Sequence, residues 1–251
     1  MLSIPDALAR TRQRISQACA ACGRDPATVT LLAVSKTHPW EVVRAAADAG
    51  LRAFGENYVQ EGVDKIRRWR EHADASMDVP HLEWHLIGPL QSNKTREVAE
   101  HFDWVHSVDR LKVAQRLSDQ RPGHLPPLQV CLQVNISGEA SKSGVAPEQT
   151  LALARAVHAL PHLRLRGLMA IPEPAADSPG RRAPLQALRM LRDRVQQAEP
   201  GLLLDVLSMG MSDDLEEAIA EGATVVRVGT ALFGRRNHGA ASPASPHDGA
   251  A

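Results

Sequence analysis

The sequence predicts a (β/α)₈ barrel with an additional helix at its N-terminus. Short apolar segments rich in β-branched residues alternate with amphipathic segments, and eight such pairs fit into the 251 residues of the chain. Strands that alternate with helices favour a parallel sheet, and barrels of this class use about 250 residues as one unit. We therefore expect a single barrel domain over residues 1–236. Residues 237–251 are rich in Ala, Ser, Pro and Gly and are expected to form a disordered tail.

The strands are predicted where short apolar runs are bounded by polar or turn-forming residues. Each run is followed by a segment with helical periodicity or by the end of the chain, which is the order that a barrel requires. The runs are residues 29–34, 52–54, 83–87, 104–108, 128–134, 163–170, 203–207 and 224–228.

The leading helix is predicted over residues 3–22, because its apolar residues recur at helical spacing and Gly23 follows it. The segment 172–184 contains four prolines and Gly180, so it is predicted to be a loop on the rim formed by the C-terminal ends of the strands. The other helices are predicted over 40–49, 57–69 and 231–236, and from starts near Gln91, Asp109, Pro147, Pro184 and Asp213.

An open, doubly wound sheet is the main alternative fold. It would normally carry a glycine-rich phosphate-binding fingerprint directly after the first strand. The sequence has no such fingerprint after residues 29–34, which favours the closed barrel.

The composition excludes several classes of function. The 29 basic residues balance 29 acidic ones, so the charge gives no footprint for nucleic acid or an anionic membrane. Aromatic residues are 3 %, too few for a stacking surface. No segment approaches the roughly 18–20 apolar residues of a membrane span, and the start lacks the pattern of a signal peptide. Three cysteines do not make a disulfide framework, so we expect a cytoplasmic protein.

Lys36 is the first candidate for chemistry. It directly follows the first predicted strand, and in barrel enzymes the reactive groups lie at the C-terminal ends of strands. Partial burial lowers the pKa of a lysine amine, and a neutral amine can form a Schiff base with a carbonyl. A lysine that simply reaches solvent from a strand end is the structural alternative.

The scarcity of lysine adds to this argument. The chain has five lysines and twenty-four arginines, and three of the lysines, Lys36, Lys94 and Lys142, fall in predicted strand-to-helix loops on one rim. Arginine does not form imines under ordinary conditions, so lysine is not a generic choice of cation at these places.

A second candidate site lies at the end of the last predicted strand. Gly229 allows close approach to the backbone, and Thr230 would begin a short helix with free N–H groups. Barrels often bind phosphate between the loops after the seventh and eighth strands. Ser208, Gly210 and Ser212 supply hydroxyls and a glycine to the adjoining loop. A plain helix cap at Ser212 or Asp213 is the structural alternative.

Taken together, the motifs resemble the YggS/PROSC family of pyridoxal 5'-phosphate homeostasis proteins. The resemblance covers roughly residues 3–236, and only the proline-rich segment and the tail depart visibly from the family pattern. The motifs are AVSKT (33–37), FGENYVQE (54–61), HLIGPLQSNK (85–94), NIS (135–137), KSG (142–144), GLM (167–169), LSMGMSDD (207–214) and VRVGTALFG (226–234).

The resemblance implies a barrel like the N-terminal domain of alanine racemase, with pyridoxal phosphate as the cofactor. It implies that Lys36 holds the cofactor as an internal aldimine and that Arg227 faces the pyridine nitrogen. By the same resemblance the phosphate is held by Ser212, Gly229 and Thr230, with Ser208 as a further candidate, and the ring pocket is lined by Asn57, His85 and Met169.

The nature of Arg227 favours cofactor binding over turnover. A guanidinium leaves the ring nitrogen unprotonated, which weakens the ring as an electron sink. In the two-domain racemases that this barrel resembles, a tyrosine of the partner chain's second domain acts as the opposite acid or base. The only tyrosine here, Tyr58, lies near the start of a predicted helix. A racemase-like pyridoxal phosphate enzyme is the main alternative function.

Two further functions stay open at this point: a cofactor-free Schiff-base lyase and a non-catalytic interaction scaffold. PLP-dependent apo-enzymes are the recipients that a homeostasis role implies, Lys142 could take the cofactor transiently, and the oligomeric state is open between a monomer and a weak dimer.

No metal is expected. Cys19 and Cys22 share one helix without a second pair, and His81 and His85 would lie about 13 Å apart on a strand.

Overall fold

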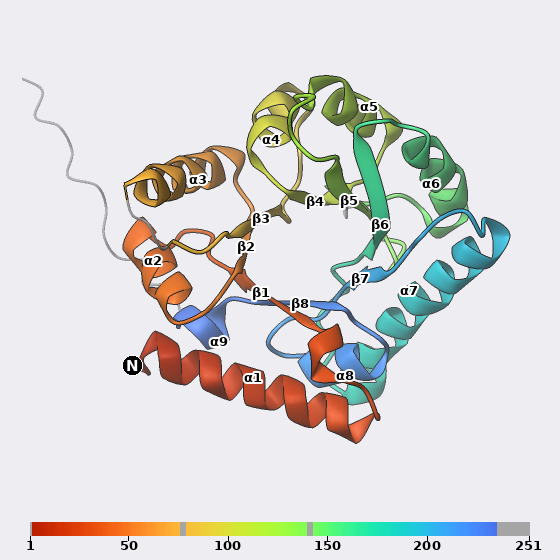
Figure 1. The fold of residues 1–251 in the computed structure, drawn as a ribbon. Coiled ribbons are helices and arrows are strands. Elements are labelled where there is room, and N and C mark those ends of the chain that lie inside the picture. The colour runs from red at the N-terminus through yellow and green to blue at the C-terminus, as the bar shows by residue number, and fades with distance from the viewer. Residues whose placement is uncertain (1, 76–78, 140–142, 235–251) are drawn as a thin grey trace, which may run out of the picture.

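The computed structural model describes residues 2–75, 79–139 and 143–234. Its eight parallel strands close into a barrel in which every strand pairs with the next and β8 pairs with β1 (Figure 1). This confirms the predicted fold class. The strands are β1 (Thr30–Val34), β2 (Ala53–Glu56), β3 (Glu83–Leu86), β4 (Trp104–Val108), β5 (Leu128–Gln133), β6 (Leu163–Met169), β7 (Val206–Ser208) and β8 (Val225–Val228).

Helices surround the barrel as an outer ring (Figure 1). Among the described residues, none of them is both long and apolar enough to cross a membrane. The helices are α1 (Ile4–Ala21), α2 (Trp40–Asp48), α3 (Val59–Asp74), α4 (Thr95–His101), α5 (Leu111–Gln120), α6 (Thr150–His158), α7 (Ser178–Ala198), α8 (Leu215–Ala220) and α9 (Thr230–Phe233). Short 3₁₀ turns precede β1, α4 and α6 at Pro26–Thr28, Ser92–Lys94 and Pro147–Gln149.

The additional helix α1 lies across α8 and α9, beside the strands β1 and β8 (Figure 1). Ser3 caps its N-terminus by accepting a hydrogen bond from the backbone N–H of Asp6. Leu8, Ile15 and Cys19 are buried on one face, as their helical spacing predicts. The predicted range of 3–22 therefore corresponds to the helix and its two capping residues.

The prediction of a loop over residues 172–184 is wrong in its second half, because α7 begins at Ser178. Asp177 caps the helix by accepting from the Gly180 N–H at 2.8 Å. Pro179 lies in the first turn, where a missing N–H costs nothing. Pro184 lies inside the helix, where it removes one hydrogen bond. Burial of Leu185, Leu188, Leu191 and Val195 on one face offsets that loss.

Other element boundaries shift by a few residues. Strand β7 begins at Val206 instead of residue 203, since Leu203 is 58 % exposed and lies in the preceding loop. The last helix begins at Thr230 and ends at Phe233, and residues 235–236 of its predicted range lie outside the described residues. The predicted tail over residues 237–251 and Lys142 also lie outside them.

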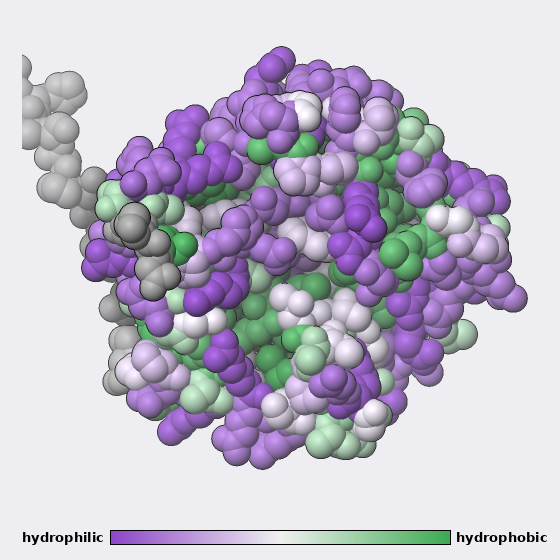
Figure 2. Space-filling view, in the orientation of Figure 1, coloured by the Kyte–Doolittle hydropathy of each residue, from purple (hydrophilic) through white to green (hydrophobic). Residues whose placement is uncertain are grey.

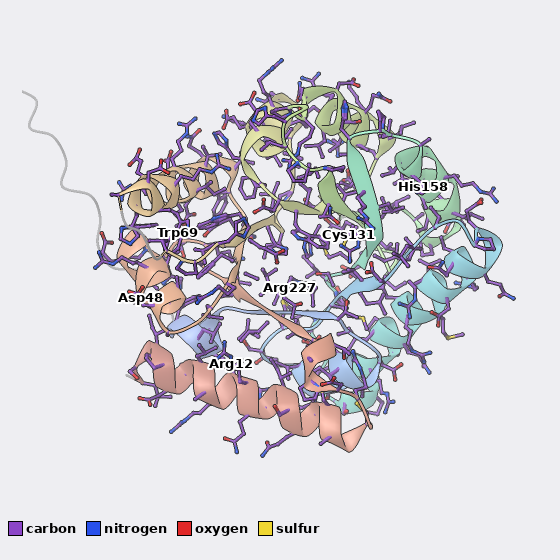
Figure 3. The ribbon with its side chains drawn as sticks, viewed as in Figure 1. Arg12, Asp48, Trp69, Cys131, His158 and Arg227 are labelled. Atoms are coloured by element: carbon purple, nitrogen blue, oxygen red, sulfur yellow. The ribbon has the colours of Figure 1, made fainter. Side chains whose placement is uncertain are left out.

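The space inside the ring of strands is a packed core. Leu32, Ala53, Cys131, Met169 and Val225 belong to one buried apolar cluster there, and Figure 3 shows Cys131 and Arg227 within the ring while Arg12 and His158 lie on outer helices. Side chains fill the barrel, as in other (β/α)₈ proteins. The outer surface is mainly hydrophilic, with hydrophobic residues visible in recesses near the middle of the face in Figure 2.

Candidate functional site

A cavity of about 290 Å³ opens at the C-terminal ends of β1, β2 and β8. Its size is near the lower end of the roughly 300–1,000 Å³ that is usual for small-molecule sites. Six of the residues predicted for the site line it together: Lys36, Asn57, Ser212, Arg227, Gly229 and Thr230. The remaining lining residues are Val34, His38, Ile87, Ile171, Met211, Asp213 and Gly234.

Lys36 lies two residues beyond the last residue of β1, in a segment with an unusual backbone. The following residue, Thr37, has a φ of +65°, a left-handed conformation that costs a non-glycine residue about 1–3 kcal/mol and persists only where surrounding structure imposes it. The Thr37 N–H donates to Glu61 Oε1 at 2.6 Å. On the other side of Lys36, the Ser35 N–H donates to the Gly55 carbonyl at 3.1 Å.

A buried ion cluster supports both neighbours of Lys36. Lys65 Nζ donates to Glu56 Oε1 at 2.8 Å, to Glu61 Oε1 at 2.7 Å and to the Ser35 carbonyl at 2.8 Å. The Ser35 hydroxyl donates to Glu56 Oε1 at 2.6 Å. Glu56 is fully buried and the Lys65 side chain is 6 % exposed. We call Glu56, Glu61 and Lys65 the acidic clamp, because they fix the chain on both sides of Lys36.

Desolvation and charge oppose each other inside this clamp. Burial raises the pKa of the Glu56 carboxyl, while the charge of Lys65 and hydrogen bonds from Lys65 and Ser35 lower it, so that a net upward shift remains. The Lys65 ammonium is therefore what makes a buried carboxylate tolerable beside Ser35.

Arg227 lines the cavity from β8, in the centre of the barrel (Figure 3). Its Nη1 donates to the Ser208 carbonyl at 2.7 Å and to Ser208 Oγ at 2.9 Å, and its Nη2 donates to the Ala170 carbonyl at 2.9 Å. Complete burial lowers the pKa of Arg227 to about 10. The guanidinium therefore stays cationic at neutral pH and is tied to the ends of β6 and β7.

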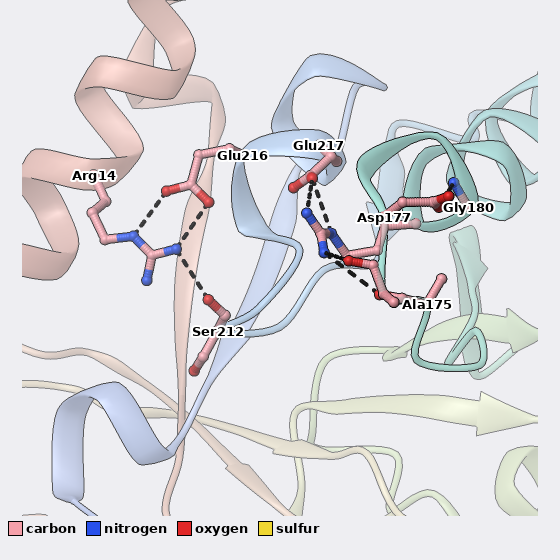
Figure 4. Close-up of polar contacts among 9 residues, drawn as sticks. Arg14, Ala175, Asp177, Gly180, Ser212, Glu216 and Glu217 are labelled. Atoms are coloured by element: carbon pink, nitrogen blue, oxygen red, sulfur yellow. Dashed lines mark hydrogen bonds and ion pairs between the residues drawn. The ribbon is translucent and has the colours of Figure 1, made fainter.

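The loop after β7 and the start of α9 form the opposite wall. Gly210 has a φ of +91°, and a Cβ there would lie 2.4 Å from Ala218 Cβ, so only glycine fits this turn. Arg14 of α1 donates to the Ser212 carbonyl at 3.0 Å and pairs with Glu216 at 2.8 Å (Figure 4). The additional N-terminal helix thus supports the loop that presents Ser212 to the cavity.

Figure 4 also shows how α7 is tied to α8 beside this loop. Arg181 pairs with Glu217 at 2.9 Å and donates to the Ala176 carbonyl at 3.1 Å. The segment before α7 is therefore fixed to the helix that follows the Ser212 loop.

Three predicted site residues do not line the cavity: Ser208, His85 and Met169. Ser208 is fully buried behind Arg227 and accepts its hydrogen bond. Met169 is fully buried in the inner apolar cluster. His85 lies deeper along β3, next to the N-terminal ends of the strands, where it lines a different cavity with Glu83 and Trp104.

Sequence reasoning missed Ile87, which lines the cavity in place of His85. Side chains on a strand alternate between its two faces, so Ile87 shares the inward direction of His85 one layer nearer the rim. The alternation marks both positions as inward, but it does not give their depth. Asp213 also lines the cavity, so an acidic residue lies beside the candidate anion-binding groups.

The cysteine motif lies at the C-terminal end of α1. Cys19 is buried in α1, Cys22 is exposed, and both are free thiols, as is Cys131. Within residues 2–75, 79–139 and 143–234, no group of three or more His, Cys, Asp or Glu could hold a metal ion.

Comparison with known proteins identifies the class to which the fold belongs. The sequence model of the alanine racemase N-terminal domain matches residues 7–237. Alanine racemase from Corynebacterium glutamicum superposes with a TM-score of 0.62 at 16 % identity, covering 96 % of this chain and 64 % of the racemase, which is a likeness of fold alone. The protein is thus a barrel of the alanine racemase N-terminal domain class.

Relatives of higher sequence identity identify the family within this class. A pyridoxal phosphate homeostasis protein from Pseudomonas aeruginosa is 62 % identical over 98 % of this chain and 100 % of its own length. Its counterpart from Escherichia coli K12 is 53 % identical over 95 % and 99 %. The structure of PipY from Synechococcus elongatus with PLP bound has a TM-score of 0.79 and 39 % identity over 92 % and 100 %. The chain belongs to the YggS/PROSC family of pyridoxal phosphate homeostasis proteins.

Proposed function

We propose that this protein binds pyridoxal 5'-phosphate in the cavity at Lys36, as a Schiff base, and acts in the homeostasis of that cofactor. One observation carries the proposal: the residues that line one cavity include an amine-bearing side chain, Lys36, a cationic one, Arg227, and the hydroxyl-bearing residues Ser212 and Thr230 of two adjacent loops. The names of the relatives and the PLP-bound PipY structure support it.

The chemistry of the lining residues fits this cofactor. Bound pyridoxal phosphate supplies an aldehyde that reacts with amines and a ring that withdraws electrons. Lys36 Nζ would bond to the aldehyde carbon, and the aldehyde oxygen would leave as water. Ser212, Gly229 and Thr230 would hold the phosphate with hydroxyl and N–H donors, and Asn57 would lie beside the ring.

The charge of Arg227 favours storage and delivery over turnover. A cationic guanidinium opposes protonation of a nearby ring nitrogen, so the bound ring would stabilise a carbanion poorly. The recipients would be PLP-dependent apo-enzymes. We further propose a cytoplasmic location, consistent with three free thiols, and a monomer or weak dimer in solution.

The absorbance of the purified protein tests the proposal. A Schiff base between lysine and pyridoxal phosphate should absorb at the edge of the visible range and should be removed by borohydride. Lys36→Ala should abolish the band. Lys112→Ala, which removes an exposed lysine of α5, should retain it. Full, reducible loading in Lys36→Ala would overturn the assignment.

A racemase-like enzyme is the second candidate, favoured only by the shared fold. Tyr58 is 58 % exposed and does not line the cavity, so an acid or base opposite Lys36 is not supplied by the one tyrosine. Exchange of amino-acid α-protons into deuterated solvent at enzymatic rates would support this alternative. The cofactor-free lyase makes a different prediction. Such a protein would stay colourless after exposure to pyridoxal phosphate, and borohydride would trap a Schiff base only when a keto substrate is present.

A further inference from the structure

A chain of polar side chains crosses the barrel core from its N-terminal end to the cavity. His85 Nδ1 lies 2.9 Å from His106 Nε2, and His106 Nδ1 lies 2.8 Å from Ser208 Oγ. Ser208 Oγ accepts from Arg227 at 2.9 Å. At the other end, His85 Nε2 lies 3.8 Å from Glu83 Oε2. We call these five residues the core relay; they come from β3, β4, β7 and β8.

The interior of the core relay is shielded from water. His106 and Ser208 are fully buried, and His85 and Arg227 are 2 % and 4 % exposed, whereas the Glu83 side chain is half exposed. Burial lowers the pKa of His106 well below its ordinary value of 6.5, and electrostatic interactions with His85 and Arg227 act in the same direction. Polar groups are rarely placed so deep unless they are hydrogen-bonded. His106, Ser208 and Arg227 are hydrogen-bonded along the relay, whereas His85 Nε2 faces Glu83 at 3.8 Å and has no hydrogen-bond partner among the described residues.

Neighbouring groups fix the outer end of the core relay. The His85 ring stacks on Trp104 with 5.3 Å between centroids and 9° between planes. The Arg166 guanidinium lies over the Trp104 ring, 5.2 Å from the ring centroid, and is paired with Asp205. Proximity to His85 lowers the pKa of Glu83, so a carboxylate faces His85 at neutral pH.

The two fixed charges set the direction of the hydrogen bonds between them. The carboxylate near His85 Nε2 favours a hydrogen on that atom, and in the neutral imidazole Nδ1 is then the acceptor. His106 then donates from Nε2 and accepts the Ser208 hydroxyl hydrogen at Nδ1. Ser208 Oγ is left with a lone pair for Arg227. The opposite direction would turn a His85 lone pair toward Glu83 and remove His106 as an acceptor for Ser208.

We propose that His106 and Ser208 are positioning residues for Arg227, and that Glu83 and His85 fix the direction of the hydrogen bonds through which they act. The relay holds the Arg227 guanidinium at the cavity, where it would donate a hydrogen bond to the unprotonated pyridine nitrogen of pyridoxal phosphate. This inference rests on the proposed function, because it concerns how the same cavity selects its ligand.

A pair of ligands isolates the contribution of the ring nitrogen. We would measure dissociation constants for pyridoxal 5'-phosphate and for 1-deazapyridoxal 5'-phosphate, in which carbon replaces that nitrogen. The wild type should bind pyridoxal 5'-phosphate roughly tenfold or more tightly than the 1-deaza compound, because a hydrogen bond to a charged group contributes about that much to a dissociation constant. Ser208→Ala and His106→Leu should reduce this preference below about threefold. His106→Gln, which keeps an acceptor and a donor, should retain more of it than His106→Leu.

Ser107→Ala is the matched control. Ser107 is a neighbouring buried serine, 3 % exposed, whose hydroxyl has no hydrogen-bond partner among the described residues. It should leave the preference unchanged. If Ser208→Ala weakens both ligands equally, or if Ser107→Ala has the same effect, the two serines have only packing roles and the inference is overturned.

Nitrogen NMR of the cofactor-free protein with labelled histidine tests the relay separately. His106 should be neutral at pH 7, with its hydrogen on Nε2 and a hydrogen-bond acceptor opposite it at His85 Nδ1. Hydrogen on His106 Nδ1 would overturn the direction of the relay, whatever the variants do. If the wild type binds neither pyridoxal compound while the NMR result holds, the proposed function fails and the relay stands as a structural device.

Discussion

Lys65 and Glu56 form a buried ion pair, with 2.8 Å between Nζ and Oε1, directly behind the segment that carries Lys36. The pair joins β2 to α3, and through Ser35 it also joins both to the end of β1. The strained φ of Thr37 is held by Glu61, which shares the same ammonium. The position of Lys36 therefore depends on a charge cluster in the wall of the barrel.

Removal of the Lys65 ammonium from the acidic clamp should lower the free energy of unfolding. Lys65→Met leaves Glu56 buried without its counter-charge, and breaking a buried pair on one side costs about 3–5 kcal/mol of unfolding free energy. Urea unfolding should show this loss, and uptake of pyridoxal phosphate should also fall. Lys112→Met, at an exposed position, is the control. A loss below about 1 kcal/mol in Lys65→Met would contradict the role of the clamp.

The support of the Ser212 loop by α1 predicts an effect specific to phosphate. Arg14→Ala removes the hydrogen bond to the Ser212 carbonyl. Its ion pair with Glu216 is partly exposed, so stability should change by less than about 1 kcal/mol. Affinity for pyridoxal phosphate should fall about threefold to tenfold, while affinity for unphosphorylated pyridoxal should not change. Equal losses for both ligands would refute this role, and Arg10→Ala on the exposed face of α1 provides the control.

Asp213 should weaken phosphate binding by its charge. Asp213 lines the cavity beside Ser212, and like charges in a partly solvated site repel by an amount that salt screens. Asp213→Asn should therefore tighten pyridoxal phosphate binding roughly twofold to fivefold at low salt. The gain should shrink as salt is added, and titrations at two ionic strengths would check this. Weaker binding in the variant would show that Asp213 instead contributes a needed contact.

The salt bridges of Glu221 predict acid sensitivity. Although burial alone would raise it, hydrogen bonds from Arg182 and Arg189 hold the pKa of Glu221 below its ordinary value of 4.5. A depressed pKa stabilises the fold above the unfolded value, and that stability is lost as the pH falls through the folded value. Unfolding free energy measured from pH 6 downward should therefore decline below about pH 4.5, and less steeply in Glu221→Gln than in the exposed control Glu148→Gln. Parallel slopes in the two variants would contradict the assignment.

The sequence predicts the barrel well because each β-branched run and each helical period is local. It places α7 less well, since prolines signal a loop although Pro179 occupies a first turn where proline is tolerated. The start of β7 is missed because the apolar run from Leu203 continues outside the strand.

The candidate site is predicted in part for a related physical reason. Strand ends indicate which residues reach the rim, so Lys36, Arg227 and Gly229 are placed together in one cavity. Depth inside the barrel is a property of the closed ring, and for that reason His85 is assigned to the cavity when it belongs to the layer below. His106 has no local signal at all, because its partners are 21 and 102 residues away in the chain.

Location of the covalent bond tests the central claim most directly. The wild-type protein would be incubated with pyridoxal phosphate, reduced with borohydride and digested, and the modified peptide would be identified by mass spectrometry. The account predicts one phosphopyridoxyl group, on Lys36. Modification spread over several surface lysines, or found mainly at another lysine, would contradict it.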